Sequence, residues 1–234
     1  MSKPYVNLGC GRIILPGPRP IHHGLIEAAL YDYPLWVNAD RNAEPGVDTV
    51  VDLFTYPWPW ADNSFDAALL THIAEHIPHQ INAVATPAAI SALGQQAAQA
   101  RAAALATAQD GWYAFMAELW RVLTPGAIAH ILSPYGWSQG AITDPTHTRL
   151  ITEHTWTHSL QPDPNSPFAY ETLGLNLRLA SDVKFAVTPL WDHLTVTEAD
   201  TPEVAERKTA ALQRAFQTQI NVAYEHYARL EAVK

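Results

Sequence analysis

The sequence predicts an α/β protein with a doubly wound, mostly parallel sheet of seven strands and helices on both faces. Short apolar segments typical of strands alternate with helical segments along most of the 234 residues, which is the pattern of such a sheet. Residues 65–70 are almost continuously apolar, as a parallel strand covered on both faces should be. At roughly 150 residues per domain, the length favours a single domain over residues 1–234 that carries an insertion.

The composition excludes several other classes of protein. Apolar residues make up 48 % of the chain and charged residues 16 %, which excludes a disordered or fibrous protein. No window of about 18 uninterrupted apolar residues predicts a membrane span, and the first residues lack the apolar core of a signal peptide. The single cysteine cannot form an internal disulfide, which favours the cytoplasm. A net charge of −9 disfavours nucleic acid as a partner.

In the first half of the chain, glycines and acidic residues mark where the expected strands end. The Gly-Cys-Gly sequence at residues 9–11 stops the first apolar run, and Asp40 and Asp52 close the second and third. Prolines within residues 16–20 predict a loop, and those in the aromatic stretch 56–60 predict another. The expected elements are strands at residues 5–8, 35–39, 48–51 and 65–70 and a short helix near residues 21–30.

The second half of the chain combines helical segments with a long loop. Residues from about 78 to 111 are dominated by alanine and glutamine, which predicts a solvent-facing helical insertion. Apolar residues at helical spacing from Trp112 to Leu123 predict an amphipathic core helix. A last helix, opened by Thr201-Pro202, is expected to extend to about residue 231. The other expected elements are a strand at residues 127–132, a short helix near residues 153–159 and an antiparallel hairpin with strands at residues 173–179 and 183–188.

Residues suited to bind a nucleoside follow the first four expected strands. They are, in chain order, Gly9 and Gly11, Asp40, Asp52, and Thr71 with His72. Because ligands of parallel sheets bind beyond the carboxyl ends of the strands, we expect these residues to line one site. The carboxylate after the second strand can accept two hydrogen bonds from a ribose diol. The carboxylate after the third strand can accept a hydrogen bond from the exocyclic amine of adenine.

Six motifs over residues 5–133 resemble, in order and spacing, those of the class I S-adenosylmethionine-dependent methyltransferases. They are Asn7-Leu8-Gly9-Cys10-Gly11, Asn38-Ala39-Asp40, Val51-Asp52-Leu53, Asn63-Ser64-Phe65-Asp66, Ile73-Ala74-Glu75-His76 and Glu118-Leu119-Trp120-Arg121-Val122-Leu123-Thr124-Pro125-Gly126. The resemblance implies a methyltransferase whose sheet has the order 3-2-1-4-5-7-6, with the last strand antiparallel. The hairpin at residues 173–188 would supply strands six and seven.

The same resemblance implies S-adenosylmethionine as the cofactor. Gly9 and Gly11 would line its methionine part, Asp40 would hold the ribose, and Asp52 with the backbone of Leu53 would hold the adenine. The expected cofactor-binding set is completed by Asn7, Cys10, Arg41, Thr71 and His72.

Two positions depart from the pattern of this family. Asn7 stands where many relatives carry an acid, so an acceptor is kept but the charge attraction to the cofactor's ammonium is lost. Ile13 stands where many relatives have a third glycine. A dinucleotide site would need a glycine at position 14, which is Ile14, so NAD is disfavoured as a cofactor.

Residues 72–76 also match H-x-x-E-H, the signature of one class of zinc metalloproteases. On a helix His72 and His76 would share a face and bind zinc, with Glu75 as the base. Pro78 disfavours a helix that continues through it, and the sequence identifies no third ligand. Zinc metalloprotease is therefore a remote alternative, and no metal ligand is assigned.

A methyl transfer needs a base only when the acceptor loses a proton as it reacts. The candidates for this catalytic role are His72, Asp144 and His147. Residues 70–73 lack the Asn/Asp-Pro-Pro-Tyr/Phe sequence of enzymes that methylate exocyclic amines of nucleic-acid bases. A small molecule or a sugar is the expected acceptor, and a protein acceptor and a homodimer stay open. The alternative function is a non-catalytic protein that binds the cofactor and has a regulatory role.

Overall fold

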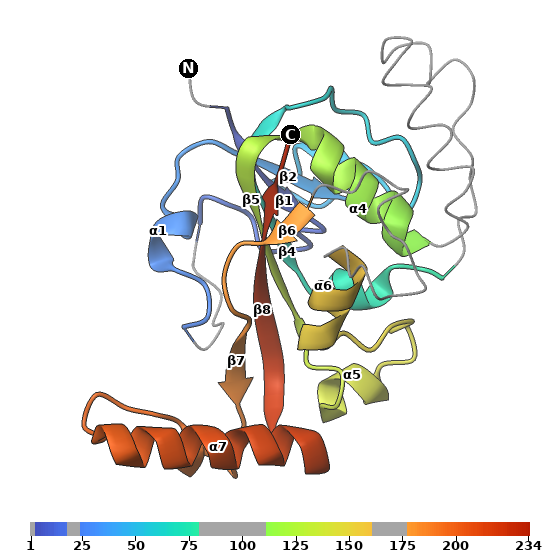
Figure 1. Ribbon diagram of the computed structural model, residues 1–234. Helices are drawn as coiled ribbons and strands as arrows, with labels where there is room; N and C mark the ends of the chain where they lie inside the picture. The colour runs from blue at the N-terminus through green and yellow to red at the C-terminus, as the bar shows by residue number, and fades with distance from the viewer. Residues whose placement is uncertain (1–2, 18–23, 80–110, 161–176) are drawn as a thin grey trace.

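A central sheet organises the computed structural model of this chain, which describes residues 3–17, 24–79, 111–160 and 177–234 (Figure 1). The strand order is β3-β2-β1-β4-β5-β8-β6, and β7 pairs with β8. The strands are β1 (Tyr5–Leu8), β2 (Trp36–Asp40), β3 (Thr49–Val50), β4 (Phe65–Thr71), β5 (Leu123–Pro134), β6 (Leu177–Leu179), β7 (Lys184–Val187) and β8 (Ala223–Ala232).

The sheet is mostly parallel, as the sequence predicts. All neighbours among β1, β2, β3, β4 and β5 are parallel, whereas β8 runs antiparallel to β5. The carboxyl ends of β1, β2 and β4 therefore meet at one edge, where the residues that follow each strand come together.

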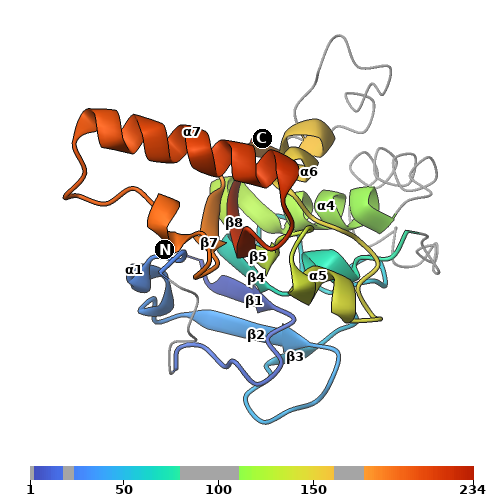
Figure 2. The ribbon, with the colours of Figure 1, turned by 90° about the horizontal axis from the view of Figure 1, so that it is seen from below.

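Helices lie on both sides of the sheet, which confirms the predicted α/β architecture (Figures 1 and 2). Leu69 and Leu70 are consecutive in β4 and point to opposite faces, so they enter two separate core clusters. Leu70 belongs to the same cluster as Phe115, and Leu69 belongs to the same cluster as Leu30. The helices are α1 (Ala28–Tyr31), α4 (Gly111–Val122), α5 (Gln139–Thr143), α6 (Glu153–Leu160) and α7 (Pro202–Thr218), with the short 3-10 helices η1 (Ala74–His76) and η3 (Asp192–Leu194).

The expected helix over residues 202–231 is wrong in its second half. α7 ends at Thr218, a turn with Asn221 at φ +56° follows, and the remaining residues form β8. The apolar residues Val204, Leu212, Phe216, Ile220, Tyr224 and Tyr227 have the spacing of one helix face, but Ile220 is 65 % exposed, and Tyr227 is buried within the sheet. β8 pairs with β5 from Ile128 to Pro134 and satisfies backbone groups that β5 would otherwise leave open at an edge.

The expected hairpin of residues 173–179 and 183–188 is also wrong. β6 and β7 do not pair with each other, because both pair antiparallel with β8, one after the other along the same strand. Leu179 lies opposite Leu230 and Lys184 opposite Tyr227, so the chain between β6 and β7 bulges and continues without reversing. The predicted order 3-2-1-4-5-7-6 is confirmed, with β8 in the place of the seventh strand.

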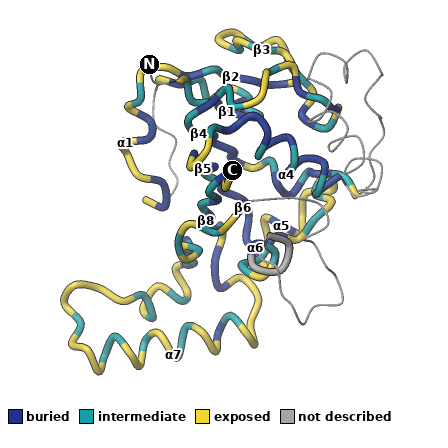
Figure 3. The backbone as a smooth tube through the Cα atoms, turned by 45° about the horizontal axis from the view of Figure 1, so that its top comes forward, coloured by how far each residue is buried: buried dark blue, intermediate teal, exposed yellow. Residues whose placement is uncertain are grey.

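Several expectations fall outside the described residues or stay untested. The alanine-rich insertion lies mostly in residues 80–110 and part of the first hairpin strand in residues 173–176, none of which the structure describes. The assignment of residues 1–234 to a single domain therefore stays a prediction. α7 begins as expected, with the Thr201 hydroxyl accepting a hydrogen bond from the Val204 N–H, and it is largely exposed (Figure 3). Among the described helices, none has the length and apolarity to span a membrane.

Two histidines of the sheet, the buried His226 and the half-buried His130, have pKa values that keep them neutral at neutral pH. His226 of β8 is fully buried, and its Nε2 accepts a hydrogen bond of 2.8 Å from the Trp156 indole N–H. Burial lowers the pKa of His226 to about 3. Burial and then the charge of Arg229 lower the pKa of His130 to about 4. Both folded-state pKa values lie below the value of an unfolded chain, about 6.5.

Lowering the pH from about 6.5 to about 5 is expected to destabilise the fold by up to about 1.4 kcal/mol per pH unit for each of the two histidines. In this range the unfolded chain takes up protons that the folded chain does not bind. Their stabilising contribution is therefore complete above about pH 6.5 and is lost as the pH falls. Urea unfolding at several pH values measures the slope, which should be smaller in His226→Gln. The control is His154→Gln, at a side chain that is 75 % exposed, and an equal slope in all three proteins would contradict the assignment.

Candidate functional site

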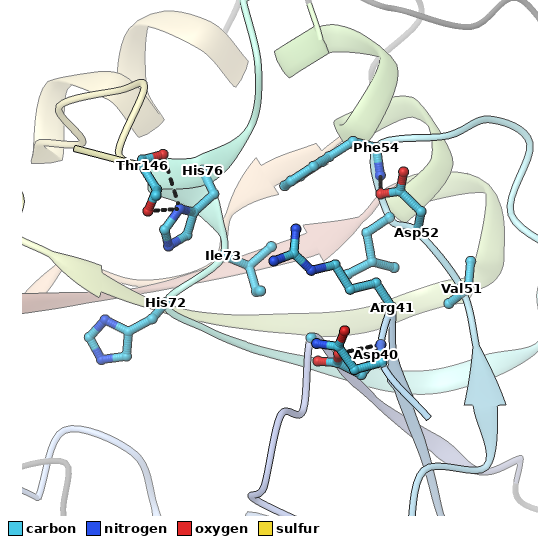
Figure 4. Close-up of a pocket in the computed structure, with 12 residues that line it drawn as sticks. Asp40, Arg41, Val51, Asp52, Phe54, His72, Ile73, His76 and Thr146 are labelled. Atoms are coloured by element: carbon cyan, nitrogen blue, oxygen red, sulfur yellow. Dashed lines mark hydrogen bonds between the residues drawn. The ribbon is translucent and has the colours of Figure 1, made fainter. Parts of the chain in front are cut away.

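A cavity of about 450 Å³ opens at the carboxyl ends of β1, β2 and β4. Its volume lies within the range of about 300–1,000 Å³ that is typical of small-molecule sites. Figure 4 shows Asp40, Arg41, Asp52 and Phe54 toward one end and His72, His76 and Thr146 toward the other. The lining residues are Gly9, Asp40, Arg41, Asn42, Val51, Asp52, Leu53, Phe54, His72, Ile73, His76 and Thr146.

A glycine turn leads from β1 past the cavity. Gly9 has φ +66° and Gly11 has φ +51°, values that an L side chain rarely adopts. A Cβ atom at Gly9 would overlap the side chain of Ile73, whereas a Cβ at Gly11 would have no atom within 4 Å. Gly9 is therefore needed both for the turn and for the close approach of Ile73 to the backbone.

The Asp40 side chain is held in place by backbone N–H groups. It is buried, and its two oxygens accept hydrogen bonds of 2.9 Å from the backbone N–H groups of Gly11 and Asn42. A carboxylate has about four lone pairs, so each oxygen keeps capacity for a further donor. The turn after β1 thus orients Asp40 toward the cavity before any ligand binds.

Asp52 is exposed and caps the turn that follows β3. Its Oδ1 accepts a hydrogen bond of 3.0 Å from the Phe54 N–H, and its Oδ2 accepts one of 3.0 Å from the Thr55 hydroxyl. The apolar neighbours Val51, Leu53 and Phe54 line the same end of the cavity. This end therefore combines a fixed carboxylate with an apolar surface, as a planar base with a polar edge requires.

The Arg41 side chain lies across this end of the cavity (Figure 4). It forms no hydrogen bond or ion pair with any other residue in the part of the chain that the structure describes. Its planar guanidinium can stack on an aromatic ring. Arg41 is therefore available to a ligand.

Four of the expected cofactor-binding residues do not belong to the described lining of the cavity. They are Asn7, Cys10, Gly11 and Thr71. Asn7 is buried and donates hydrogen bonds to the Ile13 carbonyl at 2.7 Å and to Asn38 Oδ1 at 3.1 Å. Burial, followed by the charge of Asp40, raises the pKa of Cys10 to about 11, so its thiol is unreactive at neutral pH.

His72 lies at the opposite end of the cavity in a strained backbone conformation, with φ +57°. Its Nε2 is 3.0 Å from Glu225 Oε1, and its Nδ1 is 3.4 Å from Glu75 Oε1. Hydrogen bonding to Glu225 and then to Glu75 raises the pKa of His72 to about 9.

The loop after α5 reaches the cavity through Thr146, between the two catalytic candidates Asp144 and His147. Asp144 is exposed, and hydrogen bonds from the Thr146 hydroxyl at 2.6 Å and backbone at 2.8 Å lower its pKa. His147 is mostly buried, and its Nε2 lies 4.0 Å from Glu75 Oε1. Neither candidate belongs to the described cavity lining.

The arrangement expected for a zinc metalloprotease at residues 72–76 is not formed. Only Ala74–His76 is helical, as the single 3-10 turn η1, so His72 and His76 do not share a helix face. The Glu75 carbonyl accepts hydrogen bonds from the N–H groups of Thr148 at 2.8 Å and Arg149 at 3.1 Å. These contacts with a distant loop, together with the extended residue after η1, prevent a longer helix.

Six lining residues were not among the residues expected for the cofactor or for catalysis, although His76 was considered as a zinc ligand. They are Asn42, Val51, Phe54, Ile73, His76 and Thr146. The first four are sequence neighbours of expected residues, so their proximity to them was a usable signal. His76 and Thr146 meet only because η1 packs against the loop after α5, and no local pattern encodes that contact.

Comparisons with known proteins identify the fold. No family model matches the chain, and neither does any curated protein. A S-adenosylmethionine-dependent methyltransferase from Archaeoglobus fulgidus is similar over 98 % of this chain and 86 % of its own, with 14 % identity and a TM-score of 0.50. One from Mesorhizobium loti is similar over 98 % and 91 %, with 11 % identity and a TM-score of 0.44. With the strand order, the first likeness shows that this chain has the class I S-adenosylmethionine-dependent methyltransferase fold.

Proposed function

We propose that this protein binds S-adenosylmethionine in the cavity and transfers its methyl group to a small molecule or a sugar. The observation that carries the proposal is the convergence of Gly9, Asp40 and Asp52 on one cavity. These residues follow three different strands, and they are residues to which the family resemblance assigns contacts with the cofactor.

In this proposal, the residues that follow β1, β2 and β3 each bind a different part of the cofactor. Asp40 accepts hydrogen bonds from the ribose hydroxyls, and Asp52 accepts one from the adenine amine. Phe54 and Arg41 offer planar groups for the faces of the adenine ring. The bend at Gly9 leaves room for the methionine part of the cofactor, because no side chain projects from it.

Methyl transfer requires the protein mainly to position the cofactor and the acceptor. The bound cofactor supplies an electrophilic methyl group on a sulfonium, and transfer depends on proximity, orientation and exclusion of water. The acceptor then faces Thr146 and His76, a hydroxyl and an imidazole that can hold a polar molecule by hydrogen bonds. Asp144 and His147, in the same loop as Thr146, are the residues proposed to contact a hydroxyl acceptor as it loses its proton.

Asp40→Ala is expected to weaken S-adenosylmethionine binding by about tenfold to a hundredfold, because a charge-assisted hydrogen bond contributes about 1.5–3 kcal/mol. Isothermal titration with the cofactor and with its demethylated product measures the effect. Asp52→Ala should weaken binding in the same direction, but less, because Asp52 is exposed. The matched control is Asp182→Ala, at an exposed aspartate between β6 and β7.

Two outcomes decide between the functions. The proposal would be refuted if the wild-type protein did not bind S-adenosylmethionine at millimolar concentration. Equal affinities for the cofactor in the three variants and the wild type would also refute it. A screen of methyl-donor turnover against metabolite mixtures follows. Binding without turnover for any small molecule, sugar or protein would instead identify a cofactor-binding protein with a regulatory role.

A further inference from the structure

We propose that Glu75, His76 and His147 form a binding site for a divalent transition metal beside the cavity. One carboxylate oxygen of Glu75 and one nitrogen of each imidazole lie within 4.8 Å of one another. The three residues come from η1 and from the loop after α5, more than seventy positions apart in the sequence. Zinc binding here does not depend on methyl transfer, although a metal bound to His147 would occupy the nitrogen that a base needs. The site differs from the zinc signature because His72 is not a ligand and Glu75 is one.

Glu75 is the strongest indication of a missing ligand. Its side chain is 1 % exposed. Its Oε2 has no hydrogen-bond donor among the described residues, and its Oε1 has only the long contact of 3.4 Å with His72 Nδ1 and a more distant imidazole. The nearest nitrogens lie around Oε1, at 3.4 Å for His72 Nδ1 and 4.0 Å for His147 Nε2. A buried carboxylate with one long ion pair at one oxygen and no donor at the other is costly, and a metal ion coordinated by it would offset that cost.

The two histidines are oriented as metal ligands usually are. The Nδ1 of His147 lies 3.1 Å from the Ala141 carbonyl, and the Nδ1 of His76 lies 3.2 Å from the Thr146 carbonyl. Carbonyl oxygens only accept hydrogen bonds, so each Nδ1 is the donor in these contacts and each Nε2 is the nitrogen left to coordinate a metal. This arrangement fixes the tautomer and the ring orientation that metal coordination requires.

Thr146 supports the same donor role of Nδ1 at His76. Its hydroxyl donates to Asp144 Oδ1 at 2.6 Å, so the hydroxyl oxygen is left to accept from His76 Nδ1 at 3.3 Å. The two imidazole rings meet edge to face, with centroids 4.7 Å apart. The hydrogen bonds from Thr148 and Arg149 to the Glu75 carbonyl hold the loop against η1, so the proposed ligands are positioned in advance.

The donor set selects the class of metal. Two imidazole nitrogens with one carboxylate suit Zn²⁺ and neighbouring transition metals, whereas Mg²⁺ and Ca²⁺ prefer oxygen ligands. Asp144 Oδ2 lies 3.7 Å from His147 Nε2 and can supply a fourth ligand. Because His76 also lines the cavity, a remaining coordination position would be open to a molecule bound at the acceptor end.

The test is a metal titration of the full chain after removal of bound metal with a chelator. Zn²⁺ and, separately, Mg²⁺ are added in competition with a chromophoric chelator, and bound metal is counted by elemental analysis after dialysis. The expected result is one zinc per chain and no stoichiometric magnesium. His76→Ala, His147→Ala and Glu75→Gln should each weaken zinc binding by about tenfold to a hundredfold.

His79→Ala is the matched control, because its Nε2 lies 2.8 Å from the Thr148 carbonyl in the same region but it is not a proposed ligand. Its zinc affinity should equal that of wild type. If His147→Ala does not fold by circular dichroism, His147→Asn replaces it, because the amide can keep the hydrogen bond to Ala141. Less than stoichiometric zinc in wild type, or equal losses in the ligand variants and His79→Ala, would overturn the site. Loss of cofactor binding with zinc retained would count against the proposed function alone.

Discussion

Arg121→Ala is expected to destabilise the protein by about 3–5 kcal/mol, because it leaves the fully buried carboxylate of Glu118 without its charge partner. Arg121 donates to both oxygens of Glu118, at 3.0 and 2.9 Å, and to Asp62 at 2.8 Å. It also donates to the carbonyls of Trp58 and Trp60, at 3.2 and 2.7 Å. Urea unfolding monitored by tryptophan fluorescence measures the loss.

The same substitution should also weaken cofactor binding. The loop held by Arg121 contains Trp58, whose indole N–H donates to the Leu53 carbonyl at 3.0 Å, and Leu53 lines the cavity. The matched control is Arg178→Ala, which breaks an ion pair with Glu231 at 2.8 Å on the surface. That change should cost at most about 1 kcal/mol, since Arg178 is 61 % exposed. Similar losses of unfolding free energy in the two variants would show that the buried hydrogen bonds of Arg121 stabilise the fold no more than a surface ion pair does.

Gly9→Ala is expected to weaken S-adenosylmethionine binding by about a hundredfold, equivalent to about 2.7 kcal/mol. An alanine at φ +66° is strained by about 1–2 kcal/mol. Its Cβ would also displace the Ile73 side chain, which lines the cavity. Isothermal titration measures the affinity, and thermal unfolding separates it from the loss of stability.

Two further variants isolate the steric part of this effect. Gly11→Ala carries a similar backbone strain at φ +51° but meets no atom within 4 Å, so it should lose stability and keep most of its affinity. Ile73→Ala in the Gly9→Ala background removes the displaced side chain and should restore part of the binding. No recovery in the double variant would mean that the strained turn alone explains the loss.

The first half of the fold was predictable because its signals are local. The glycines after β1, the aspartates after β2 and β3, and the helical spacing from Trp112 to Leu123 each mark an element or its end within a few residues. The prediction of the third strand was less accurate, because residues 48–51 were expected and only Thr49 and Val50 form β3. For the same reason the end of the cavity that contains Asp40 and Asp52 could be predicted by residue.

The C-terminal part was not predictable from local patterns. Residues 223–232 contain buried positions whose spacing fits a helix almost as well as a strand, and the choice depended on the unpaired backbone groups of β5. The bulge between β6 and β7 likewise exists because β8 offers one continuous partner for both segments. Such decisions depend on contacts between residues from about 36 to about 103 positions apart in the sequence.

The amino-acid sequence by itself determined the class of fold, the mostly parallel half of the sheet and the turn and carboxylates at one end of the cavity. Only the tertiary structure decided which segment lies beside β5 and which side chains meet near Glu75. The physical reason is the range of the interactions. Turns, caps and amphipathic faces depend on neighbours along the chain, whereas strand pairing and the cluster of Glu75 with His76 and His147 require segments that meet only after folding.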